Sequence, residues 1–259
     1  MRTDLSGRTA LVTGAGRGNG REIAQMLAEN GASVVVNDLD EGPAEETVDE
    51  IMSAGGDAVA VSADISDEAA VQAMVETGTD ALGTIDLLVN NAGIGRGDRF
   101  KNKPDDTFWN LQLGVHLWGS IYCTKHVLDG MLDQGYGKVV NVTSIHTKNG
   151  VGMSPQYDVT KYSLVGLTKT LALELGRDGI RVNAVAPGWT ETRMTADFDA
   201  ETREQILNLN PLDRFASSEE IAEAVHFLCA PASDYVNGHE LRVDGGQQPI
   251  DSWKHRYDD

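Results

Sequence analysis

The stretch of sequence that decides the fold is residues 9–20, TALVTGAGRGNG. Its first part, Thr9–Thr13, is mostly apolar or β-branched and predicts a short buried strand. Glycine then occupies every second position from 14 to 20, and a segment with apolar residues at helical spacing follows. A strand, a glycine-rich turn and a helix in this order bring backbone N–H groups to the positive end of the helix, where a pyrophosphate is favoured. The stretch therefore predicts a dinucleotide site at the start of an α/β sheet.

The rest of the chain alternates between strand-like runs and longer segments with apolar residues at helical spacing. Further strands are expected at Ser33–Asn37, Ala58–Ser62, Leu87–Asn90, Lys138–Val142, Arg181–Ala186 and Glu240–Val243. Strands separated by helices predict an α/β fold, a Rossmann-like, doubly wound parallel sheet of about seven strands with helices on both faces. We expect one dinucleotide-binding domain over 1–259, with 189–214 as a helical excursion outside the core and 244–259 as a C-terminal tail.

Composition narrows the class of protein. Lys plus Arg number 21 and Asp plus Glu 40, a formal charge of −19, which disfavours nucleic acid and anionic membranes as partners. No apolar run approaches the roughly 20 residues of a membrane span, and no signal region opens the chain, so we expect a cytoplasmic protein. Cys123 and Cys229 lie in apolar surroundings and predict small buried side chains, with no disulfide framework and no metal site.

Three element boundaries are visible in the sequence. Asn30-Gly31 is expected to end the first helix, because glycine tolerates the left-handed conformation after a helix. The run 66–68 is expected to begin the third helix, with Ser66 better placed than Asp64 to cap it. Pro187-Gly188 is expected to end a strand.

Polar residues follow several strands, at the carboxyl edge where open α/β sheets bind ligands. Asp38 ends the second strand, 24 residues after Gly14, where a carboxylate accepts hydrogen bonds from the adenosine ribose and repels a 2′-phosphate. It predicts NAD rather than NADP, whereas Arg17 in the glycine loop is a potential phosphate partner and favours the opposite choice. Asp64 follows the third strand, and Asn90–Gly93 follows the fourth.

A second group of residues suggests acid–base chemistry. Ser144 follows the fifth strand, and Tyr157 and Lys161 come later at a spacing of four residues. If Pro155 begins a helix, Tyr157 and Lys161 share one face of it. A nearby ammonium is expected to lower the tyrosine pKa from about 10. Ser144 would then hold a substrate oxygen while Tyr157 transfers the proton. Taken alone, Tyr-x-x-x-Lys often occurs by chance, as a surface pair on a helix.

Taken together, these motifs resemble those of the classical short-chain dehydrogenase/reductase (SDR) family over almost the whole chain. The resemblance is carried by Thr13-Gly14-x-x-x-Gly18-x-Gly20, Asn90-Asn91-Ala92-Gly93, Ser144, Tyr157-x-x-x-Lys161, Asn183, and Pro187-Gly188 followed by Thr190 and Thr192. Both the order of these motifs and the spacings between them match the pattern of the family.

The resemblance implies an NAD-dependent oxidoreductase that passes hydride directly between nicotinamide and the carbon of a secondary alcohol or ketone, without a metal. Tyr157 would be the general acid or base, Lys161 would bind the nicotinamide ribose, and Ser144 would orient the substrate oxygen. The implied cofactor site comprises Gly14, Arg17, Gly18, Asn19, Gly20, Asp38, Asp64, Ile65, Asn91, Ala92, Gly93, Tyr157, Lys161, Pro187, Gly188, Thr190 and Thr192.

Two positions depart from the family pattern. His116 stands where many members carry an asparagine whose backbone carbonyl holds a relay water. We expect that backbone role to be kept; the alternative is an imidazole that joins the relay, since histidine titrates near neutral pH. Asn19 stands where an aliphatic residue is usual, and we expect it to alter cofactor contacts without abolishing binding.

The resemblance places the substrate beside Tyr157, under the segment that follows Pro187-Gly188. The expected lining residues are His146, Met153 and Trp189, together with Arg96, Asn149, Met194 and Phe198. A sugar, a hydroxy acid, a steroid-like ring and an aryl ketone all remain open as substrates.

Two other functions compete with this one: an NADPH-dependent carbonyl reductase, for example of a 3-oxoacyl thioester, and a nucleotide-sensing protein without turnover. The aromatic residues Trp253 and Tyr257 of the C-terminal tail suggest docking on a neighbouring subunit, and a homotetramer is expected. A tail folded over its own active site is the alternative.

Overall fold

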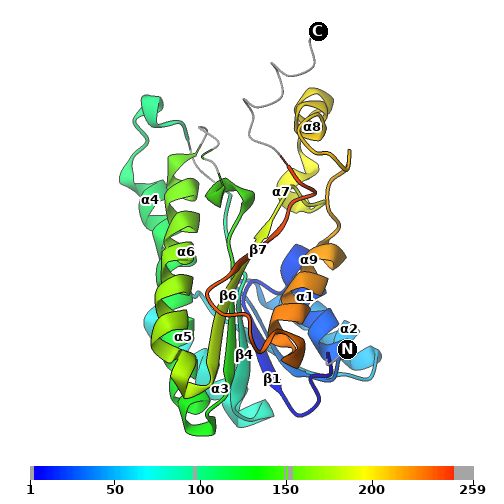
Figure 1. The fold of residues 1–259 in the computed structure, drawn as a ribbon, viewed down its shortest axis with the longest axis vertical. Helices are drawn as coiled ribbons and strands as arrows, with labels where there is room; N and C mark the ends of the chain where they lie inside the picture. Colours follow the sequence, from blue (N-terminus) through cyan, green and yellow to red (C-terminus); the bar gives the residue numbers. More distant parts are fainter. Residues whose placement is uncertain (1–2, 96–97, 149, 151–153, 248–259) are drawn as a thin grey trace.

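The fold is a seven-stranded parallel sheet with the strand order β3-β2-β1-β4-β5-β6-β7. The computed structural model describes residues 3–95, 98–148, 150 and 154–247. The strands are β1 (Thr9–Val12), β2 (Ser33–Asp38), β3 (Asp57–Ser62), β4 (Ile85–Asn90), β5 (Gly137–Val142), β6 (Ile180–Pro187) and β7 (Glu240–Val243). The chain starts in the middle of the sheet, builds one half, and returns past β1 to build the other half (Figure 1).

Every strand expected from the sequence is present, with ends that differ by at most two residues. The largest difference is at β4, which begins at Ile85 because Asp86 is part of the strand. The buried Asp86 carboxylate accepts hydrogen bonds from Arg8 and from the backbone N–H of Thr9, so a charged residue is accommodated inside the sheet.

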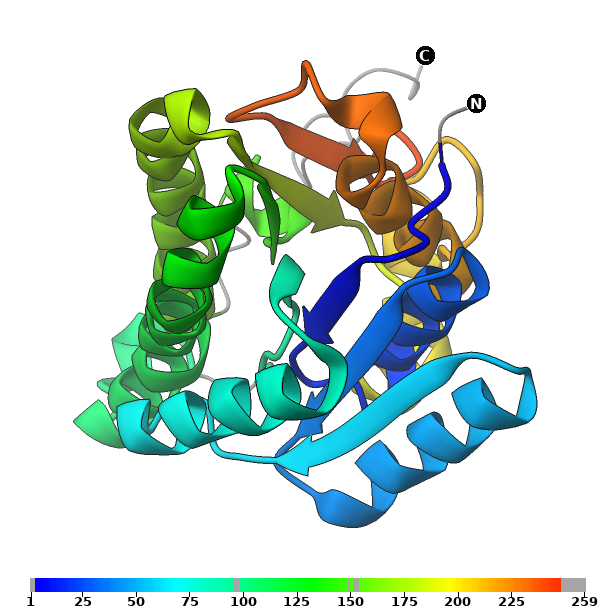
Figure 2. The same cartoon turned by 90° about the horizontal axis from the view of Figure 1, so that it is seen from below.

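Helices cover both faces of the sheet, as the strand–helix alternation predicted. One face carries α1 (Gly18–Glu29), α2 (Glu41–Ser53) and α9 (Ser218–Cys229), and the other carries α3 (Glu68–Leu82), α5 (Gly119–Gln134) and α6 (Pro155–Leu175). Figure 2 shows the blue α1 and α2 and the orange α9 on one side, with the cyan and green helices on the other.

The core is divided by the sheet into two apolar clusters. Ala10 and Val12 of β1 contribute to the cluster beneath α1 and α9, whereas Leu11 between them contributes to the cluster beneath α3 and α5. This is the period of two that a strand imposes when both its faces are buried. Cys229 belongs to the first cluster and Cys123 to the second, so the prediction of buried cysteines is confirmed.

The helix ends follow the expected signals with one correction. Gly31, at a φ of 96°, follows the C-cap of α1, and Pro155 opens α6, as predicted. The expectation that Ser66 caps α3 is wrong: Asp67 is the cap and accepts from the N–H groups of Ala69 and Ala70. Ser66 instead donates its own N–H and hydroxyl to Asp64, which forms a local turn before the helix.

Short elements surround the carboxyl end of the sheet, where Figure 1 shows α4 on one side and α7 and α8 on the other. They are η1 (Phe100–Asn102), α4 (Asp106–Gln112), the π-helical turn η2 (Leu113–Trp118), η3 (Ile145–Thr147), α7 (Arg193–Ala196) and α8 (Ala200–Leu207). Two further 3-10 turns, η4 (Gly176–Asp178) and η5 (Pro231–Ser233), lie elsewhere. Within the described residues, no helix has the length and apolarity needed to cross a membrane. The tail residues Trp253 and Tyr257 lie outside the described part of the chain.

Candidate active site

The glycine loop between β1 and α1 is packed so closely that side chains are excluded. A Cβ on Gly20 would lie 2.1 Å from the carbonyl oxygen of Gly14, and a Cβ on Gly14 would lie 2.8 Å from the Cα of Ala92. Gly14 and Gly18 also adopt positive φ values of 61° and 55°, which other residues rarely adopt. The first turn of α1 can therefore approach the end of β4 only because these positions are glycine.

Replacing Gly20 with alanine is expected to lower the free energy of unfolding by about 1–3 kcal/mol, because the added methyl group overlaps a backbone oxygen that cannot rotate away. Gly42→Ala is the matched control: it also lies in a helix, and its Cβ would meet nothing within 4 Å. That change should be neutral or slightly stabilising. Urea unfolding of both variants checks the prediction, and an equal effect of the two would contradict it.

Asn91 holds the glycine loop rather than merely following β4. Its side-chain amide donates to the carbonyl oxygens of Thr13 and Gly14, at 2.9 and 3.1 Å. The Thr13 hydroxyl in turn accepts from the backbone N–H groups of Asn91 and Ala92, both at 3.0 Å. These four hydrogen bonds join the ends of β1 and β4, so the loop has a fixed shape before any ligand arrives.

Asp38 lies directly beside the glycine loop, at the end of β2. One carboxylate oxygen accepts from the N–H of Gly16 at 2.9 Å, and the other is 3.2 Å from the N–H of Asp40. Asp40 forms an ion pair of 2.7 Å with the guanidinium of Arg17. The cation that could bind a 2′-phosphate is thus already paired, while the acidic group that repels a phosphate is held at the loop.

The residues Ser144, Tyr157 and Lys161 come together at the carboxyl end of β5 and the start of α6. Ser144 is buried, and its side chain is near enough to the Tyr157 hydroxyl to lower the pKa of the phenol. Lys161 lies one helical turn after Tyr157, its Nζ donating to the carbonyl oxygen of Val142 at 2.8 Å and lying 5.7 Å from the Tyr157 ring centre. The shared helix face predicted from the spacing is present.

The predicted lowering of the Tyr157 pKa is wrong for the protein in this structure. Burial raises the pKa of Tyr157 above its ordinary value of 10, and the hydrogen bond with Ser144 offsets only part of the shift. Burial also lowers the pKa of Lys161 to about 8. Desolvation shifts the pKa of both groups. The spacing of the motif alone therefore predicted the wrong direction for the pKa shift of Tyr157.

The depressed pKa of Lys161 makes a pH-dependent prediction about stability. The folded pKa of about 8 lies below the ordinary value of 10.5, so the unfolded chain binds more protons between these limits and stability rises with pH there. Below pH 8 the cost of burying the ammonium is fully present. Lys161→Met removes this cost at every pH. Its advantage over the wild-type protein in free energy of unfolding should therefore shrink by about 2 kcal/mol between pH 7 and pH 10. Lys169→Met, at an exposed site on the same helix, should show no such trend in urea unfolding.

His116 lies in the π-helical turn η2, buried beside Tyr157, with the two ring centres 5.5 Å apart. Its Nε2 accepts from the N–H of Ile94 at 3.0 Å, so Nδ1 carries the proton and donates to the Thr160 hydroxyl at 2.7 Å. Burial, followed by the charge of Lys161, holds the pKa of His116 well below its usual value. A neutral imidazole with both nitrogens bonded joins the β4 loop to α6, which disfavours an imidazole relay, while the backbone role of His116 stays a prediction.

The residues present fit a nicotinamide dinucleotide. The N-terminus of α1 has no side-chain cap, which leaves its first N–H groups available to an anion. A Cβ on Gly18 would approach Thr192 at 3.7 Å, so the segment after β6 faces the glycine loop. A Cβ on Gly93 would meet Lys161 Nζ at 3.6 Å, so the absence of a side chain there leaves space beside the ammonium.

The remaining predicted cofactor residues serve the surrounding structure as well. Asn19 accepts a hydrogen bond from Ser218, which ties α1 to α9, and Ile65 packs into the core. The backbone N–H of Gly188 donates to the carbonyl oxygen of Val243 at 2.8 Å, which holds the end of β6 against β7. Thr190 is buried, and Thr192 begins α7.

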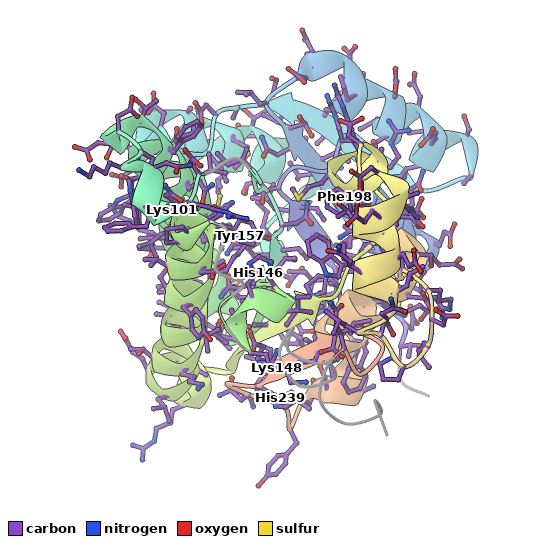
Figure 3. The ribbon with its side chains drawn as sticks, turned by 90° about the horizontal axis from the view of Figure 1, so that it is seen from above. Lys101, His146, Lys148, Tyr157, Phe198 and His239 are labelled. Carbon is purple, nitrogen blue, oxygen red and sulfur yellow. The ribbon has the colours of Figure 1, made fainter. Side chains whose placement is uncertain are left out.

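On the substrate side, an aromatic row extends from Tyr157. The ring of His146 lies 5.0 Å from that of Tyr157 and 6.2 Å from that of Trp189, and Trp189 lies 5.3 Å from Phe198. Figure 3 shows Tyr157 and His146 between α6 and the yellow helical segment that carries Phe198. Met194 contacts the β4 loop, since a Cβ on Gly95 would lie 2.9 Å from its sulfur. Met153, Arg96 and Asn149 lie outside the described residues.

Sequence reasoning missed two carboxylates near Ser144. Glu240 of β7 lies within hydrogen-bonding distance of the hydroxyls of Thr143 and Thr147, on either side of Ser144, at 2.8 and 2.6 Å. Asp158 pairs with His146. No pattern identifies Glu240, which lies 96 residues beyond Ser144 in the numbering; Asp158 was signalled only by its place beside Tyr157.

Known proteins resemble this chain over nearly its whole length. Residues 14–248 match a family model described as enoyl-(acyl carrier protein) reductase. The 3-oxoacyl-[acyl-carrier-protein] reductase of Synechocystis is 40% identical, over 94% of this chain and 98% of its own. A 7α-hydroxysteroid dehydrogenase complexed with NADH and 7-oxo glycochenodeoxycholic acid superposes with a TM-score of 0.92 at 34% identity, covering 95% of this chain and 96% of that one.

A gluconate 5-dehydrogenase from Burkholderia cenocepacia, in complex with NADP and tartrate, gives a TM-score of 0.90 at 34% identity, again over 95% and 96% of the two chains. Similarity of this extent, found in sequence and in structure, shows that the chain is an oxidoreductase that belongs to the short-chain dehydrogenase/reductase family, as its motifs predicted.

Proposed function

We propose that this protein is an NAD(H)-dependent dehydrogenase of a secondary alcohol, or the corresponding ketone reductase, with Tyr157 as the proton-transfer group. The observation that carries the proposal is that the buried Ser144 and the buried Lys161 meet Tyr157 where β5 ends and α6 begins, with Lys161 Nζ 5.7 Å from the Tyr157 ring centre. When bound, the nicotinamide supplies the group that accepts or donates hydride. In the reduction, the Tyr157 hydroxyl gives its proton to the substrate carbonyl oxygen as the alcohol forms, which leaves a phenolate, and Ser144 orients that oxygen; the oxidation is the reverse of this proton transfer.

The proposed preference for NAD over NADP rests on the charged residues beside the glycine loop. Asp38 lies where an adenosine ribose is expected, and Arg17 is engaged by Asp40. Similar proteins include complexes with NADP and with NADH, so family membership alone leaves the choice open. The second candidate is an NADPH-dependent carbonyl or 3-oxoacyl reductase, which the similarity to the Synechocystis reductase favours.

The proposal is tested by following NADH absorbance with a panel of secondary alcohols and ketones, offered with NAD(H) and with NADP(H) at equal concentrations. We expect turnover of an alcohol or ketone with NAD(H) in preference. Turnover confined to NADPH and a 3-oxoacyl thioester would establish the second candidate. NAD binding without turnover of any compound would favour a nucleotide-sensing protein and overturn the enzymatic proposal.

A cytoplasmic location and a homotetramer stay predictions. Light scattering of the purified protein measures the assembly, and a monomer at micromolar concentration would contradict the tetramer.

A further inference from the structure

The imidazole of His146 occupies a defined place next to the proton-transfer tyrosine. His146 is the second residue after Ser144, and its backbone N–H donates to the Ser144 hydroxyl at 3.2 Å. Its ring stands edge-on to Tyr157 and faces Trp189 on the loop after β6. The side chain is 13% exposed, so it is held in place but reachable from the site. Figure 3 shows it next to Tyr157.

Asp158 fixes the orientation of this imidazole. Its carboxylate oxygen lies 2.5 Å from Nδ1 of His146, and the Asp158 side chain is only 14% exposed. An ionised carboxylate only accepts hydrogen bonds, so Nδ1 carries a proton directed at Asp158. In the neutral imidazole, Nε2 then bears a lone pair. Nε2 has no hydrogen-bond partner among the residues that the structure describes.

A fixed imidazole beside a reacting centre has two possible uses. Proton transfer to and from the reacting oxygen belongs to Tyr157 under the proposed function, so His146 is left to contact another part of the substrate. A lone pair at Nε2 accepts a hydrogen bond from a hydroxyl. A carboxylate at the same place would be disfavoured by the negative charge of Asp158.

We propose that the His146–Asp158 pair binds a second hydroxyl of the substrate, a few bonds from the reacting carbon, so that the substrates are diols and the matching hydroxy ketones. The inference rests on the proposed function and deepens it. His146 contacts the substrate, whereas Asp158 is a positioning residue that acts through His146.

The test compares substrates that differ by one hydroxyl: 2,3-butanediol with 2-butanol, and cyclohexane-1,2-diol with cyclohexanol. The wild-type protein should prefer the diol of each pair in kcat/KM. His146→Phe keeps a ring against Tyr157 and Trp189 but removes both nitrogens. It should lower kcat/KM about 10- to 100-fold more for the diols than for the mono-alcohols.

Two further variants separate recognition from packing. Asp158→Asn should reduce the diol preference in the same direction by a smaller factor, because the orientation of the imidazole is weakened. His239→Phe alters an exposed histidine directly before β7. It should leave kcat/KM for both kinds of substrate unchanged. An equal fall on diols and mono-alcohols in His146→Phe would show a packing role and overturn the proposal.

The failure of the inference can be told apart from the failure of the proposed function. Turnover of mono-alcohols with no diol preference in the wild-type protein overturns the inference and leaves the dehydrogenase standing. The absence of turnover with every compound of the wider panel overturns both.

Discussion

Tyr157→Phe should lower kcat about 10³-fold while NADH binding changes by less than about threefold. The substitution removes one hydroxyl, the group whose pKa Ser144 influences, and leaves the ring that contacts His146 and His116 in place. Proton transfer by a positioned side chain is worth factors of this size, whereas the phenyl ring still fills the same space. Initial rates from NADH absorbance and a fluorescence titration with NADH measure the two quantities.

Tyr162→Phe is the matched control for this experiment. Tyr162 lies on the same helix, five residues further on, but its side chain is exposed at 45%. Its loss should leave kcat unchanged. If Tyr157→Phe kept more than about a tenth of the wild-type kcat, Tyr157 would not be the proton-transfer group.

Asp38→Asn should reduce the preference for NAD over NADP about 100-fold. The substitution keeps the size of the side chain and an oxygen for the Gly16 N–H, but it removes the charge that repels a 2′-phosphate. It also weakens the acceptor offered to the ribose hydroxyls. The ratio of kcat/KM for the two cofactors, measured at one ionic strength, reports the change.

A second variant at the same site addresses Arg17. Asp40→Asn breaks its ion pair, which frees the guanidinium, so NADP should gain affinity while NAD is little affected. Glu45→Gln removes one charge from an exposed position of α2 and serves as the control for net charge. An unchanged cofactor ratio in Asp38→Asn would assign the selection of the cofactor to other residues.

The order of strands and helices along the chain could be predicted from the sequence because the signals for it are local. Apolar runs and helical periodicity located every strand to within one or two residues, and Gly31 and Pro155 marked helix ends through their own backbone preferences. The glycine loop could be predicted equally well, because glycine itself marks positions such as 14 and 20, where the structure leaves no room for a Cβ. The motif spacings were sufficient to predict the family.

What the sequence did not reveal depends on groups that meet only in three dimensions. The shift of the Tyr157 pKa has the opposite direction to the prediction because burial, which spacing does not report, raises that pKa even though Lys161 lies 5.7 Å from the ring centre. The N-cap of α3 is Asp67 and not the predicted Ser66, because the Ser66 hydroxyl donates to Asp64.

The sequence by itself determined the sheet, the glycine loop and the order of the motifs. Backbone preference and hydrophobic periodicity depend only on residues that are close together in the chain. Tertiary structure alone decided that Arg17 pairs with Asp40, that both nitrogens of His116 are bonded, and that Asp158 orients His146. Hydrogen bonds and desolvation depend on distance in space, and the chain brings these partners together only when the sheet is complete.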